Sequence, residues 1–177
     1  MQFTFETNYD RKGLAVMAKC LRKTVRKAKS KRSHILGWVV VVLAALLSWP
    51  FGEGGFTVDF RKVLTWLVMA VMVAALLFED RLNGYFAGKR MLKGTEKAAS
   101  VFDTEAVGFV SETAVGKSEF SYDTVQLVAE TAEYFVFVFS ASHAQIYDKS
   151  SLTGGTAAEF RQFIADRTGK PVVTLDK

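Results

Sequence analysis

The side chains best suited to catalysis or metal binding are few in this chain of 177 residues. It has two histidines, His34 and His143, and a single cysteine, Cys20. His34 lies in a basic stretch, and His143 lies in a Ser-Ala-Ser-His-Ala segment that is typical of a turn. A dedicated metal site needs several ligands at a fixed spacing, and neither HExxH nor CxxC occurs. We therefore predict that the chain holds no metal and no other cofactor.

The remaining motifs also give no catalytic set. Gly154 and Gly155 precede a predicted helix and could hold an anion, but no P-loop lysine or GxGxxG pattern accompanies them, so we interpret them as a loop. No GxSxG nucleophile elbow occurs. Cys20 lies beside an apolar stripe, where a buried thiol is a better interpretation than an acylation site. We expect a protein that is not an enzyme.

Two long apolar runs dominate the chain, at residues 35–52 and 63–78, with a short turn-rich connection between them. At ~1.5 Å per residue the first run covers about 27 Å, close to a ~30 Å hydrocarbon core. Trp38 lies near one end of this pair, and Trp49 and Trp66 lie near the other, as in an aromatic belt. We predict a transmembrane helical hairpin over residues 35–78. The alternative is a pair of buried core helices, which would need a large soluble shell.

Charge is distributed unevenly around these runs. The formal charge is +5 overall, with +10 in residues 1–97 and −5 in residues 98–177. Residues 11–32 are predicted to form one amphipathic helix along the inner leaflet, with an apolar stripe at Leu14, Met17, Leu21, Val25 and Ala28. The rival interpretation packs this stripe on the acidic C-terminal part of the chain. The candidate lipid-contacting residues are Lys19, Arg22, Lys23, Arg26, Lys27, Lys29, Lys31 and Arg32.

The basic flanks also predict orientation and partners. Lys and Arg are concentrated before the first run and after the second, so both termini are expected in the cytoplasm and residues 53–59 outside. We predict a multi-pass protein of the cell membrane. Basic residues directly beside an apolar span favour an anionic bilayer as partner, not nucleic acid. A protein partner is expected but not identified by the sequence, and association with further copies of the chain is left open.

The predicted organisation has four parts: a strand and basic helix in residues 1–34, the hairpin in 35–78, a helical linker in 79–97 and a cytoplasmic domain in 98–177. The linker is expected to continue the second apolar helix to about Gly94, and residues 3–6 to add a strand to a sheet elsewhere. Thr156 and Glu159 predict the capping box of a C-terminal helix. The fold class is α+β, as a PH-like partial barrel closed by that helix or as a simple α+β layer. Strands are predicted at residues 100–102, 106–112, 120–122, 125–130, 134–140 and 144–147.

Three segments of the chain resemble the YcxB-like membrane proteins of bacteria. They are SYDTVQLVAETAEYFVFVFS at residues 121–140, AQIYDK at 144–149 and EFRQFI at 159–164, and an F-x-F opening, a basic helix and a two-helix hairpin precede them. The chain departs from the family pattern at Tyr122 and Asp148, where members tend to have Trp and Pro. The resemblance implies the topology and the domain plan above, and it implies no specific activity.

Two functions fit these observations. The first is a membrane-anchored module whose cytoplasmic domain binds a protein or a lipid headgroup. The alternative is a small accessory subunit of a larger membrane complex, bound through its hairpin. Neither apolar run contains an ionisable residue of the kind that ion pathways use, so a channel or transporter formed by one copy is not expected.

Overall fold

The computed structural model describes residues 2–48, 59–90 and 94–175. Within these residues the chain forms two four-stranded sheets and five α-helices, so the predicted α+β class is confirmed. Trp49 and most of the predicted connection between the two apolar runs lie outside the described residues.

The first sheet has the strand order β1-β2-β3-β4 and is antiparallel throughout. β1 (Gln2–Asn8) pairs along its whole length with β2 (Lys97–Asp103), so the prediction that the N-terminal segment adds a strand to a distant sheet is confirmed. β3 (Gly108–Thr113) and β4 (Gly116–Ser121) complete the sheet. Because β1 and β2 are neighbours, the helices between them are an insertion into this sheet.

The second sheet has the order β7-β6-β5-β8. β5 (Leu127–Glu130), β6 (Tyr134–Val138) and β7 (Ala144–Asp148) are antiparallel, and β8 (Val172–Thr174) runs parallel to β5. β8 was not predicted, because three residues are too few to show the alternation of a strand.

Several predicted strand ends are wrong, because residues 106–107, 122, 125–126 and 139–140 lie outside the strands. Tyr122 was expected in a strand, but it begins the 3-10 turn η1 (Tyr122–Thr124), and the hydroxyl of Ser121 accepts a hydrogen bond from the backbone N–H of Asp123 at 3.4 Å. This local side-chain bond offers the backbone an alternative to the strand ladder. A second 3-10 turn, η2 (Lys149–Ser151), follows β7.

The core lies between the two sheets and is rich in phenylalanine. α5 (Ala157–Thr168) closes it, and the ring centroid of Phe160 lies 4.7 Å from that of Phe5. Every residue of β6 is buried: Phe135 and Phe137 belong to this core, while Val136 and Val138 belong to a second cluster under α1. The prediction of a strand covered on both faces is therefore confirmed. The capping box of Thr156 and Glu159 is also present.

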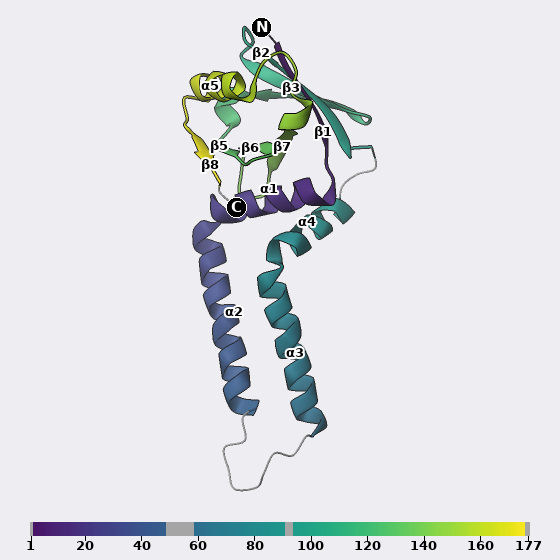
Figure 1. Ribbon diagram of the computed structural model, residues 1–177, viewed down its shortest axis with the longest axis vertical. Helices are drawn as coiled ribbons and strands as arrows, with labels where there is room; N and C mark the ends of the chain where they lie inside the picture. The colour runs from purple at the N-terminus through teal and green to yellow at the C-terminus, as the bar shows by residue number, and fades with distance from the viewer. Residues whose placement is uncertain (1, 49–58, 91–93, 176–177) are drawn as a thin grey trace.

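The basic N-terminal helix is two helices, where the sequence predicted one over residues 11–32. α1 (Arg11–Lys23) ends at Thr24, whose hydroxyl donates to the carbonyl of Cys20 at 2.7 Å, and α2 (Lys27–Ser48) begins three residues later. α1 lies across the lower side of the second sheet, whereas α2 leads away from it (Figure 1). The chain turns between α1 and α2 because the apolar stripe of α1 is buried against the sheet, whereas the apolar residues of α2 are not buried.

The second apolar helix also turns where the sequence predicted a continuation. α3 (Phe60–Leu77) stops at Phe78, and α4 (Glu79–Arg90) turns to pack along α1. α2 and α3 run side by side away from the sheets, with α1 and α4 across their ends (Figure 1). Both long helices are apolar enough to cross a membrane, and no residue of either apolar window is buried.

Candidate functional site

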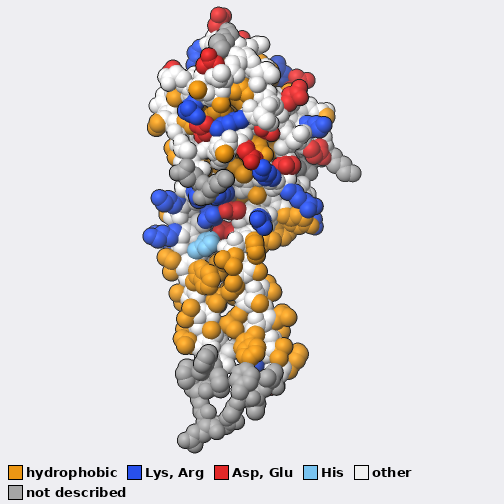
Figure 2. Space-filling view, in the orientation of Figure 1, with side chains coloured by type: hydrophobic (Ala, Val, Ile, Leu, Met, Phe, Trp, Pro, Cys, Tyr) orange, Lys and Arg blue, Asp and Glu red, His pale blue; other side chains and the backbone are white. Residues whose placement is uncertain are grey.

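The eight predicted lipid-contacting residues fall around the junction where α2 and α3 meet α1 and α4. We call these eight residues the basic collar. Figure 2 shows Lys and Arg side chains gathered between the apolar helices and the sheets. Three members lie on α1, Arg26 lies in the turn, and four lie on the first turns of α2. In that order they are Lys19, Arg22 and Lys23, then Arg26, then Lys27, Lys29, Lys31 and Arg32.

The apolar stripe expected to enter the bilayer does not face outward. Leu14 and Leu21 are buried, and Met17 packs against the cluster that contains Val136 and Ile146. The prediction that this stripe inserts into lipid is therefore wrong. The rival interpretation, that it packs on the C-terminal part of the chain, is correct. The reason is that the outer face of the second sheet is itself apolar, so each surface covers the other. Val25 lies beyond the end of α1 and is exposed.

Arg22 is engaged inside the protein. Its guanidinium donates two hydrogen bonds to Asp80 of α4, at 2.7 and 2.6 Å, and this bonding raises the pKa of Arg22 further above its ordinary value. The neighbouring Glu79 contacts His34 of α2, with 2.5 Å between the carboxylate oxygen and Nε2. These pairs tie α1, α2 and α4 together. Sequence reasoning predicted Arg22 as a lipid contact and assigned His34 to the basic flank, because their acidic partners lie far along the chain.

α1 and α4 approach each other closely at Gly84. A methyl group added there would lie 2.7 Å from the backbone nitrogen of Ala15, which is closer than real contacts allow. Glycine is therefore required for this packing, and the close contact fixes one wall of a groove between the two helices.

This groove has a volume of about 720 Å³, within the range typical of ligand pockets. One wall comes from residues of α1 that recur every three or four positions and so share one face of the helix. The other wall comes from the corner between α3 and α4. The lining residues are Arg11, Lys12, Ala15, Val16, Lys19, Leu77, Phe78, Asp80, Arg81 and Tyr85. Cationic and apolar side chains thus line the same groove at the C-terminal end of α3.

The other sequence candidates have structural roles. Cys20 is fully buried, and burial raises the pKa of its thiol to about 11. His143 stacks on Phe139, with ring centroids 4.9 Å apart. Gly154 has a φ of +87°, and a side chain there would meet the backbone oxygen of Gln2 at 1.8 Å, so this glycine is required by close packing against β1.

Comparison with known families identifies the part of the chain built on the two sheets. Residues 102–164, from the end of β2 to Ile164 of α5, match the model of the YcxB-like protein family. The chain contains a YcxB-like domain. No curated protein and no solved structure matches the chain. The match covers β3 to β7 and most of α5, and it does not extend to β1, to β8 or to the four helices between β1 and β2.

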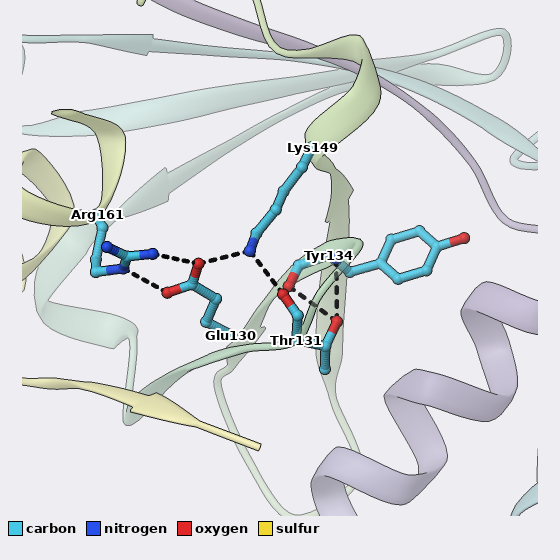
Figure 3. Close-up of polar contacts among 5 residues, drawn as sticks. All are labelled: Glu130, Thr131, Tyr134, Lys149 and Arg161. Atoms are coloured by element: carbon cyan, nitrogen blue, oxygen red, sulfur yellow. Dashed lines mark hydrogen bonds and ion pairs between the residues drawn. The ribbon is translucent and has the colours of Figure 1, made fainter. Parts of the chain in front are cut away.

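A buried carboxylate joins the three segments that resemble YcxB-like proteins. Glu130 of β5 is 5% exposed and accepts two hydrogen bonds from Arg161 of α5, at 2.5 and 2.7 Å (Figure 3). Lys149 approaches the same carboxylate at 2.5 Å and donates to the carbonyl of Thr131 at 2.6 Å. Arg161, then Lys149, lowers the pKa of Glu130. All the polar groups of this cluster are used within the YcxB-like domain, so its geometry is that of a structural clamp.

Proposed function

We propose that this chain is a membrane-anchored interaction module of the cell membrane. In this proposal α2 and α3 span the bilayer as a hairpin, and the YcxB-like domain with β1 lies on the cytoplasmic side, where it binds a protein or a lipid headgroup. The observation that carries the proposal is the pair of apolar, unburied helices that emerge from the basic collar. A soluble protein rarely leaves apolar patches of this size exposed.

The lengths of the two helices support a span. At ~1.5 Å per residue, the apolar part of α2 at residues 35–48 covers about 21 Å, and the apolar run continues in the sequence to residue 52; the 18 residues of α3 cover about 27 Å. The helices also pack closely at Gly37, where an added methyl group would meet Leu76 at 2.8 Å. Small residues at such contacts are typical of helix pairs in membranes.

The fold of the YcxB-like domain supports a finer proposal, that it is PH-like. Two packed sheets, mostly antiparallel, enclose one core, and a C-terminal helix seals it through Phe160. An experimentally determined structure in which α5 lay away from this core would contradict the PH-like assignment.

The topology gives the first test. Reporter fusions at residue 54 and at the C-terminus should report opposite sides of the membrane, with the C-terminus and the N-terminus in the cytoplasm. The full chain should also stay in the membrane fraction after carbonate extraction. Signals from the same side at both fusion sites would contradict the hairpin, and release by carbonate would contradict the anchor.

The alternative function is a small accessory subunit of a larger membrane complex, and the outward apolar faces of α2 and α3 favour it. Crosslinking in native membranes should be compared between the natural chain and a variant whose hairpin is replaced by an unrelated one. If the partners are lost with the natural hairpin, the accessory subunit is correct. If they are retained, they bind the domain and the interaction module is correct.

A further inference from the structure

The groove between α1 and the α3–α4 corner combines two properties that one class of ligand would use together. Its cationic wall carries Arg11, Lys19 and Arg81, and its apolar wall carries Leu77 and Phe78. Leu77 is the last residue of α3, and Glu79 begins the polar α4. The groove therefore lies at the level where the apolar helix gives way to charged sequence.

The other two charged side chains that line the groove, Lys12 and Asp80, are already neutralised. Lys12 pairs with Glu133 at 2.5 Å, and Asp80 is held by Arg22. None of Arg11, Lys19 and Arg81 forms an ion pair with a described residue. The groove therefore has an excess of positive charge.

Two of these cations are held in place by aromatic rings. The guanidinium of Arg81 lies 5.7 Å from the ring centroid of Phe78, and that of Arg11 lies 5.5 Å from the centroid of Tyr85. A ring contact orients a cation without cancelling its charge. Both guanidinium groups therefore keep their capacity to bind a phosphate, for which the planar fork of arginine is well suited.

We infer that this groove binds one anionic phospholipid from the inner leaflet, with the phosphate held by Lys19 and Arg81 and the start of an acyl chain against Leu77 and Phe78. The inference rests on the proposed membrane hairpin, because only that orientation brings the groove to the lipid headgroups. The apolar wall distinguishes a lipid from a free anion, which would leave Leu77 and Phe78 without a partner.

The test uses the full chain in a mild detergent that carries equal amounts of phosphatidylglycerol and phosphatidylcholine. Native mass spectrometry should show retention of one phosphatidylglycerol per chain in preference to phosphatidylcholine. The double variant Lys19→Gln with Arg81→Gln should lose about 25-fold in affinity for phosphatidylglycerol, at about fivefold for each basic residue. The charge-preserving variant Lys19→Arg with Arg81→Lys should recover most of this loss, which shows that the groove still forms.

A matched control removes two collar charges that do not line the groove. Lys27→Gln with Lys29→Gln takes away the same charge from the exposed first turn of α2. Its phosphatidylglycerol retention should change by less than about twofold, since these two charges lie outside the groove and salt screens their attraction for the lipid.

Three results would overturn the inference. They are equal loss in the control variant, equal retention of both lipids by the natural chain, and displacement of the lipid by excess inorganic phosphate. Carbonate extraction of the same variants separates this inference from the proposed function. A natural chain that stays in the membrane but shows no preference for phosphatidylglycerol contradicts only the groove, whereas release of the natural chain contradicts the membrane hairpin.

Discussion

Replacing Glu130 with glutamine should destabilise the YcxB-like domain more than any other change in the polar cluster. The side chain of Glu130 is 6% exposed, that of Lys149 is 16% exposed and that of Arg161 is 49% exposed. Glutamine leaves the ammonium of Lys149 largely buried, with the carbonyl of Thr131 and the ring of Phe135, 4.7 Å away, as neighbours. Removing one partner of a buried pair costs about 3–5 kcal/mol, and removing an exposed partner costs about 1 kcal/mol or less.

The predicted order of effects follows from these exposures. Glu130→Gln should lower the free energy of unfolding by about 3 kcal/mol. Arg161→Gln should lower it by about 1 kcal/mol, because Glu130 keeps Lys149 and water reaches the lost position. Glu119→Gln is the matched control: Glu119 is 75% exposed, faces Lys117 at 3.4 Å, and should change stability by less than about 0.5 kcal/mol.

Hydrogen exchange of the full chain is the appropriate assay. The three tryptophans, Trp38, Trp49 and Trp66, lie outside the YcxB-like domain, so their fluorescence reports on the hairpin region instead. Amides of β5 and β6 lie in the core and exchange through global opening of the domain. A loss of 3 kcal/mol should reduce their protection about 150-fold.

The dependence on pH gives a second readout of the same cluster. Folding lowers the pKa of Glu130, so its stabilising contribution is complete above the ordinary pKa of a glutamate and is lost as the pH falls through the lowered value. The difference between the natural chain and Glu130→Gln should therefore shrink below about pH 4. Equal protection in Glu130→Gln and Glu119→Gln at neutral pH would refute the clamp.

Four further outcomes are expected. Phe160→Ala should lower the free energy of unfolding of the domain by about 3–5 kcal/mol in urea denaturation, because the ring is fully buried among other phenylalanines. Gly84→Ala should weaken the packing of α4 on α1, seen as faster hydrogen exchange in both helices with β3 unchanged. Cys20 should react with a maleimide only after denaturation, since the thiol is buried and its pKa is raised to about 11. Tyr122→Phe should raise the melting temperature or leave it unchanged, because the buried hydroxyl has no hydrogen-bond partner among the described residues.

The elements that could be predicted from the sequence are those whose residue types alone indicate their structure. Consecutive aromatic and β-branched residues predicted β6, and a capping box predicted α5. Both elements lie where the sequence predicted them. The turn between α1 and α2 could not be read in this way. Residues 11–32 keep a helical pattern throughout, and the break arises because the two halves bury their apolar residues against different surroundings.

The groove was not predictable for a related reason. Lys19 was identified as a lipid contact from its place in a basic run, whereas Arg11 and Arg81 were not. Arg11 lies on the same helix as Lys19, whereas the approach of Arg81 to Lys19 depends on the turn at Phe78 and on the packing of Gly84 against Ala15. The packing that fixes this turn joins Gly84 to Ala15, which is far away along the chain, so no local sequence pattern indicates the turn.

The helices between β1 and β2 form an insertion whose two ends meet beside the first sheet. Asn8 lies opposite Lys97, and the N–H of Tyr9 donates to the carbonyl of Glu96 at 2.8 Å, so both ends of the insertion must arrive at one place. A flexible loop of this length would close at a considerable cost in entropy. The pairing of α2 with α3 and the Arg22–Asp80 contact hold the two ends of the insertion near each other in the folded chain. In the proposed orientation both ends of the hairpin lie in the cytoplasm, which is the arrangement that lets β1 and β2 form one sheet.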